Sequence, residues 1–80
     1  MDDQDIVHHI TQLADEEHAL ERSHAGEGLS ETDLGRMRDI EVALDQCWDL
    51  LRQRRARRNA GQDPDGASTR PADTVEGYQQ

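Results

Sequence analysis

The sequence lacks phenylalanine and lysine, and it contains one tryptophan, one tyrosine and one cysteine. A single cysteine excludes an internal disulfide and a cysteine-rich zinc site. A hydrophobic fraction of 32% with so few aromatic side chains is too small to fill a wide core. No apolar run reaches the length of about twenty residues that a membrane span needs, and no signal-peptide pattern opens the chain. We therefore expect a small cytoplasmic protein without membrane association.

Charged residues are unevenly distributed along the chain, whose formal net charge is −9. Residues 1–51 contain fourteen acidic residues and three arginines, whereas residues 52–58 contain five arginines and no acidic residue. We name these five residues the arginine collar: Arg52, Arg54, Arg55, Arg57 and Arg58. The chain is thus predicted to be acidic over most of its length, with one basic segment.

Residues 31–59 are predicted to form one long helix, because apolar side chains recur at intervals of three and four residues. These apolar positions are Leu34, Met37, Ile40, Ala43, Leu44, Cys47, Trp48 and Leu51. Ser30, followed three residues later by Asp33, is a capping signal for the helix start. At the other end, arginines complement the helix dipole, Gly61 permits a left-handed exit, and Pro64 prevents continuation.

Residues 4–24 carry a second helical pattern, with apolar side chains at Ile6, Ile10, Leu13 and Leu20. Two glycines close together in residues 25–29 end this helix, and such a short connection makes consecutive helices antiparallel. The fold class predicted is all-α, a two-helix antiparallel hairpin formed by residues 1–60. The apolar patterns match when Leu20 lies opposite Leu34, Ile10 opposite Leu44 and Ile6 opposite Trp48.

The apolar stripes of both predicted helices are wider than a two-helix contact can cover. A chain of this size without a disulfide or metal also has a small core. Two hairpins packed together would form a four-helix bundle and cover the remaining apolar side chains. We therefore expect a homodimer.

Residues 61–80 are polar and rich in turn-forming residues, without helical or strand periodicity, and are predicted to form an extended arm. Val75 and Tyr78 supply an apolar pair near its end. This pair is a candidate docking segment, either for the chain's own helices near Trp48 or for another protein.

The arginine collar and Trp48 are the other candidate binding residues. Basic helical surfaces bind phosphates, acidic proteins and nucleic acids. The collar also fits a structural role, because it would complement the helix dipole and pair with Asp2, Asp3 and Asp5. The acidic net charge and the absence of interleaved aromatic residues favour an acidic protein partner over nucleic acid. Trp48 fits either a core position or an anchor for a partner.

No pattern in the sequence favours an enzyme or a cofactor site. Glu21 and His24 have the spacing of ferritin-like metal ligands, but the predicted hairpin register places Glu41 about 16 Å from His24. Cys47 lies in the apolar stripe, where burial opposes nucleophilic reactivity. We expect no catalytic residues, metal or cofactor, and interpret the chain as a non-enzymatic interaction or adaptor protein. A nucleic-acid-associated protein and a ferritin-like metal-binding hairpin are the alternatives.

Several strings of the sequence resemble those of one protein family. They are LDQCWDLLRQRRARRNAGQDPD at residues 44–65, VEGY at residues 75–78, the opening DDQDI, and DEEH at residues 15–18. Together they are similar to domain of unknown function family 2630, a family of short bacterial proteins from high-GC genomes. The resemblance implies a stand-alone cytoplasmic protein of unassigned activity, and it carries over no catalytic or binding residue.

Overall fold

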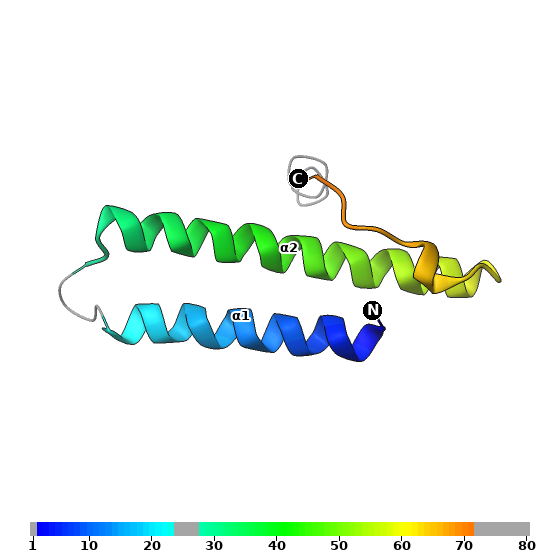
Figure 1. Ribbon diagram of the computed structural model, residues 1–80, viewed down its shortest axis with the longest axis horizontal. Helices are drawn as coiled ribbons and strands as arrows, with labels where there is room; N and C mark the ends of the chain where they lie inside the picture. The colour runs from blue at the N-terminus through cyan, green and yellow to red at the C-terminus, as the bar shows by residue number, and fades with distance from the viewer. Residues whose placement is uncertain (1, 24–27, 72–80) are drawn as a thin grey trace.

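A computed structural model describes residues 2–23 and 28–71 of the chain. Within these ranges the chain forms two α-helices, α1 (Asp3–Ser23) and α2 (Glu31–Asn59), and a short 3-10 helix, η1 (Pro64–Gly66). The two α-helices lie antiparallel and side by side (Figure 1). The predicted all-α hairpin is therefore confirmed, and the predicted helix bounds differ from the observed ones by at most one residue.

Local signals in the sequence explain where α2 begins and ends. The Ser30 hydroxyl accepts a hydrogen bond from the Asp33 backbone amide at 3.2 Å, which confirms the predicted cap. Gly28 precedes this cap with a φ of 76°, and Gly61 follows the helix with a φ of 75°. Both values lie in the left-handed region, which glycine adopts without steric cost. The chain can therefore reverse direction at both ends of α2.

The core between α1 and α2 is small. Among the described residues the buried hydrophobic side chains are Ile6, Leu13 and Ile40. Three large hydrophobic side chains remain exposed in the same part of the chain: Val7 at 44%, Leu34 at 42% and Trp48 at 49% of their surface. The hairpin therefore leaves part of its apolar surface uncovered. The predicted homodimer, which would cover this surface, stays a prediction.

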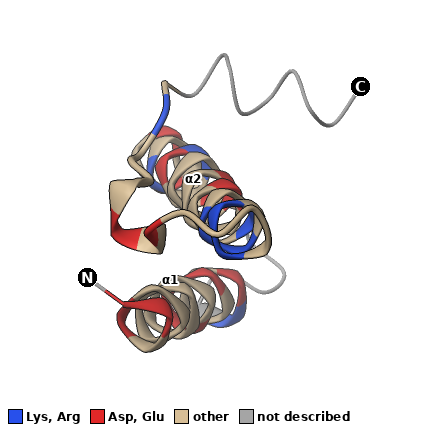
Figure 2. Cartoon of the chain, turned by 90° about the vertical axis from the view of Figure 1, so that its right-hand side faces the viewer, with Lys and Arg blue, Asp and Glu red and all other residues tan. Residues whose placement is uncertain are grey.

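The segment after α2 folds back instead of extending into solvent. The η1 turn packs against the end of α2, and residues 67–71, which we name the returning segment, then run back along α2 (Figure 1). Seen from the end of the molecule, the returning segment rises along α2 (Figure 2), and Thr69 shares the lining of one surface pocket with Ile6 and His9 of α1. Val75 and Tyr78, the predicted docking pair, lie outside the described residues. The division of the chain into a hairpin and an arm at residue 60 also stays a prediction.

Neither helix, over the residues that the structure describes, is both long and apolar enough to cross a membrane.

Candidate interaction site

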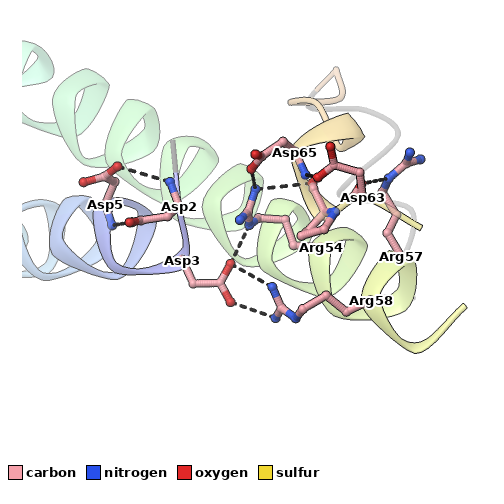
Figure 3. Close-up of polar contacts among 9 residues, drawn as sticks. Asp2, Asp3, Asp5, Arg54, Arg57, Arg58, Asp63 and Asp65 are labelled. Atoms are coloured by element: carbon pink, nitrogen blue, oxygen red, sulfur yellow. Dashed lines mark hydrogen bonds and ion pairs between the residues drawn. The ribbon is translucent and has the colours of Figure 1, made fainter. Parts of the chain in front are cut away.

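Arg54 is the most enclosed member of the arginine collar, with only 7% of its side chain exposed. Its guanidinium donates to the Asp3 carboxylate, to Asp65 Oδ1 at 2.9 Å and to the Pro64 carbonyl at 3.3 Å (Figure 3). These partners come from the start of α1 and from η1. Arg54 therefore ties both segments to α2.

Arg57 and Arg58 are also bound within the chain. Arg58 donates two hydrogen bonds to Asp3, at 3.2 and 2.8 Å, and Arg57 donates to the Asp63 carbonyl at 2.6 Å (Figure 3). The hydrogen bonds from Arg58 and then from Arg54 lower the pKa of Asp3 below its ordinary value. The predicted pairing of the collar with the start of α1 thus holds for Arg54 and Arg58, whereas Arg57 binds a backbone carbonyl after α2 instead.

Two of the acidic residues predicted to face the collar have a different role. The Asp2 backbone amide donates to Asp5 Oδ2 at 3.1 Å, and the Asp5 amide donates to Asp2 Oδ1 at 2.9 Å (Figure 3). This reciprocal pair satisfies amides at the start of α1 in the manner of a capping box. The prediction that Asp2 and Asp5 pair with the arginines was therefore wrong, and Asp3 alone of the three does so.

Arg52 and Arg55 differ from the rest of the collar. Both are exposed, and neither lies within ion-pair distance of an acidic group in the part of the chain that the structure describes. Successive residues of a helix point about 100° apart, so Arg55 projects away from the partners that Arg54 reaches. The collar therefore divides into three bound arginines and two that are available to a ligand.

These two arginines border a groove of about 350 Å³ between α1 and α2. We name it the Trp48 groove; its described lining residues are Asp3, Val7, Trp48, Leu51, Arg52, Arg55 and Arg58. Val7, Trp48 and Leu51 give it an apolar surface, and the arginines give it a cationic border. The predicted binding residues Trp48, Arg52, Arg55 and Arg58 thus come together, whereas Arg54 and Arg57 do not line this groove.

A second polar centre was not found by sequence reasoning. Asp49 is fully buried on α2, and its carboxylate accepts hydrogen bonds from both ends of the Arg70 guanidinium and from Gln53, the last at 2.9 Å. The bond from Arg70 is the main reason that the pKa of Asp49 is lowered despite burial. Gln46 and Gln53 also bind backbone carbonyls of the returning segment, at Arg70 and Ser68. The one available signal was that Arg70 is the sole basic residue after residue 58.

Cys47 is a partly buried thiol whose Sγ lies 4.0 Å from His9 Nδ1. Burial raises its pKa, so the thiolate is disfavoured. Among the described residues no group of three histidine, cysteine, aspartate or glutamate side chains is placed to hold a metal. His24, part of the metal alternative considered above, lies outside these residues.

Comparison with known proteins agrees with the resemblance seen in the sequence. Two uncharacterized proteins, one from Mycobacterium bovis and one from Mycobacterium tuberculosis, are each 52% identical to this chain over 77 residues. The match covers 95% of this chain and 88% of each relative. No solved structure shows significant similarity. The family model described as "Protein of unknown function (DUF2630)" matches residues 2–80, and the chain therefore belongs to this family.

Proposed function

We propose that the protein is a non-enzymatic interaction protein that binds an acidic protein surface in the Trp48 groove. The observation that carries this proposal is an exposed tryptophan beside two arginines that have no ion-pair partner among the described residues. Tryptophan and arginine are the residues most enriched in the energetic centres of protein interfaces. A carboxylate-bearing partner with an apolar side chain matches both parts of the groove.

The composition of the groove supports a binding role rather than catalysis. Its described lining residues include no histidine, cysteine, serine or threonine. The one carboxylate, Asp3, accepts hydrogen bonds from Arg54 and Arg58, and these bonds hold its pKa low. A low pKa makes Asp3 a weak base, so it is poorly suited to general acid–base chemistry near neutral pH.

Charge favours a protein partner over nucleic acid. The chain has a net charge of −9, and Asp3 lies within the groove itself. Arg52 and Arg55 can neutralise two phosphates, which gives a slope of only about −1.4 for single strands and about −1.8 for duplex DNA in the dependence of log affinity on log salt. Proteins that rely on phosphate contacts for tight binding make several times more of them.

The proposal is tested with a synthetic peptide that carries one central leucine among glutamates, added to dilute protein. Trp48 is the sole tryptophan of the chain, so its fluorescence reports directly on the groove. We expect a saturable blue shift of the emission. Replacing the two available arginines, in Arg52→Gln/Arg55→Gln, should weaken binding roughly tenfold, since exposed ion pairs contribute up to about 1 kcal/mol each.

The matched control is Arg22→Gln/Arg38→Gln, which removes the same charge from exposed positions outside the groove. This control should bind the peptide as the wild type does. An equal loss of affinity in both double variants would show that only net charge matters, and the proposal would fail. Preferential binding of a single-stranded oligonucleotide of the same length would instead identify the nucleic-acid alternative.

A further inference from the structure

We infer that the surface which fills the Trp48 groove is the acidic, loop-proximal half of a second copy of this chain, bound antiparallel. This inference rests on the proposed function, because it names the partner of the same groove. The two hairpins would lie face to face with their long axes opposed. The basic end of each would then contact the acidic end of the other.

The side chains that are exposed or only partly buried form two stripes, one on each helix. On α2 they follow a spacing of alternately three and four residues, which places them on one stripe: Leu34, Met37, Glu41, Leu44, Trp48, Leu51, Arg55 and Arg58. On α1 the same spacing connects Asp3, Val7, Ile10, Ala14, Glu17 and Glu21. The three exposed large hydrophobic residues of the described chain, Val7, Leu34 and Trp48, all belong to these two stripes.

This spacing is the pattern by which helices pack against other helices in bundles and coiled coils. The returning segment does not cover the face, because none of residues 63–71 lines the Trp48 groove. The face that the two stripes form therefore has the geometry of a helix-packing surface and has no helix packed on it within the described chain. A second helical hairpin fits such a surface better than an extended peptide does.

The distribution of charge determines whether the second copy packs parallel or antiparallel. Both stripes end in charged residues: Arg55 and Arg58 at the end of α2, and Glu17 and Glu21 near the end of α1. A parallel arrangement would place the arginines of the two copies together and their glutamates together. An antiparallel arrangement places Arg52 and Arg55 of each copy beside acidic residues of the other, which favours association.

The contacts between α1 and α2 set the register of the second copy. The apolar residues of the α2 stripe run from Leu34 to Leu51, and among them Leu44 lies nearest the midpoint. A two-fold axis at Leu44 brings Arg52 to the level of the second copy's Arg36, because each lies eight residues from the axis. Glu16 is at that level, since it accepts a hydrogen bond from Arg36 Nη2 at 2.7 Å.

Glu17 follows directly and lies on the uncovered stripe, and Glu21 is one helical turn further along. The register that centres the apolar side chains thus also places Arg52 and Arg55 opposite the second copy's Glu17 and Glu21. Because the axis makes both ends equivalent, the same contact occurs twice in each dimer. Charge and apolar periodicity, which are independent properties of the sequence, therefore select one arrangement.

Charge exchange tests this arrangement on the full chain. The variants Arg52→Glu/Arg55→Glu and Glu17→Arg/Glu21→Arg each place like charges together at both ends of the proposed dimer. Sedimentation equilibrium should show a concentration-dependent dimer for the wild type, and each variant should raise the dissociation constant at least tenfold. Trp48 emission should shift to the blue over the same concentration range as the dimer forms.

An equimolar mixture of the two variants is the decisive sample. In a mixed dimer both ends again pair glutamate with arginine, so the mixture should recover a dissociation constant within about threefold of the wild type. The control Arg22→Glu/Arg38→Glu carries the same change in net charge outside the interface and should dimerise normally. Circular dichroism checks folding, and Arg52→Gln/Arg55→Gln replaces the charge reversal if that variant unfolds.

Three results would overturn the inference. A chain that stays monomeric while the acidic peptide still binds would refute the dimer and leave the proposed function standing. A dimer that neither charge-exchange variant weakens would refute the register. A Trp48 emission that is already blue-shifted in the monomer, and moves to the red when the chain is truncated after Pro71, would identify the chain's own tail as the occupant.

Discussion

The two sides of α2 differ in whether their side chains find interaction partners within the chain. On the side of the returning segment, Asp49, Gln53 and Gln46 all find partners in residues 68–70. On the side of the Trp48 groove, Arg52 and Arg55 form no ion pair among the described residues, and Trp48 is half exposed. The same helix therefore has one side that is complete within the chain and one that is not.

This difference follows from the free-energy penalty that each side would carry if its side chains had no partners. A buried carboxylate without a cation or hydrogen-bond donor is unfavourable by several kcal/mol, roughly 3–5 in measured cases, so the Asp49 side has to be completed in every folded molecule. An exposed arginine or a half-exposed tryptophan costs little, because water solvates the one and part of the other. The groove side can therefore remain open until a partner binds.

The largest loss of stability is expected for Arg70→Ala. The change leaves the buried Asp49 carboxylate with Gln53 as its remaining described partner, and should lower the free energy of unfolding by roughly 3 kcal/mol. Release of residues 67–71 would admit water to Asp49 and set an upper limit on the loss. Urea unfolding followed by circular dichroism measures the change. Arg55→Ala, on the groove side, is the matched control and should change stability by less than about 0.5 kcal/mol.

Acid weakens the contact between Asp49 and Arg70. The loss of stability should be smaller than for Arg70→Ala, because protonated Asp49 still occupies its site. The Arg70 guanidinium lowers the folded-state pKa of Asp49 below its ordinary value of 3.8. Its contribution to stability is therefore complete above about pH 3.8 and declines as the pH falls through the lower, folded-state pKa.

Asp3 and Glu16 also have lowered pKa values, caused by their arginine partners, so the wild type loses more than one contribution in acid. The informative quantity is the difference in unfolding free energy between wild type and Asp49→Asn. It should be flat above about pH 3.8 and shrink below it. A difference that grows as the pH falls would contradict the assigned direction.

The helices were predictable because their signals are local. Apolar spacing identified both helices, Ser30 marked the start of α2, and Gly61 marked its end. Such signals depend on neighbours within one or two helical turns, which the sequence displays directly. The contacts of Glu16 with Arg36 and of Asp3 with Arg54 also agree with the predicted antiparallel register.

The completed side of α2 was not predictable, because its partners are distant in sequence. Asp49 looks like any polar helix position until Arg70, 21 residues later, returns to it. The collar shows the same limit on a smaller scale. Its five arginines form one basic segment in the sequence, yet the helix turns Arg54 toward Asp3 and leaves Arg55 exposed. Composition predicted a basic patch but could not show which of its charges are already paired.

Alanine substitutions at two glycines test whether the turn after α2 requires the left-handed backbone conformation of Gly61. Gly61→Ala places a Cβ at a φ of 75°, and should cost about 1–2 kcal/mol although no atom lies close enough to clash. Gly35→Ala, within α2 and equally free of close contacts, should instead stabilise by about 0.8–1 kcal/mol through helix propensity. Thermal unfolding of both variants measures the two signs. Equal stabilisation by both would show that the left-handed exit is not required.

Trp48→Ala is expected to have only a small effect on the stability of the single folded chain. Burying a large side chain in a core makes its truncation cost about 3–5 kcal/mol, but 49% of Trp48 is already in contact with water. At concentrations where the chain is monomeric, we expect a loss of less than about 1 kcal/mol in urea unfolding. Ile40→Ala is the matched control in the core, and should cost about 2–5 kcal/mol because Ile40 is fully buried. If Trp48→Ala destabilised the monomer as much as Ile40→Ala does, the tryptophan would be part of the chain's own core, and the groove side would be no less complete than the other.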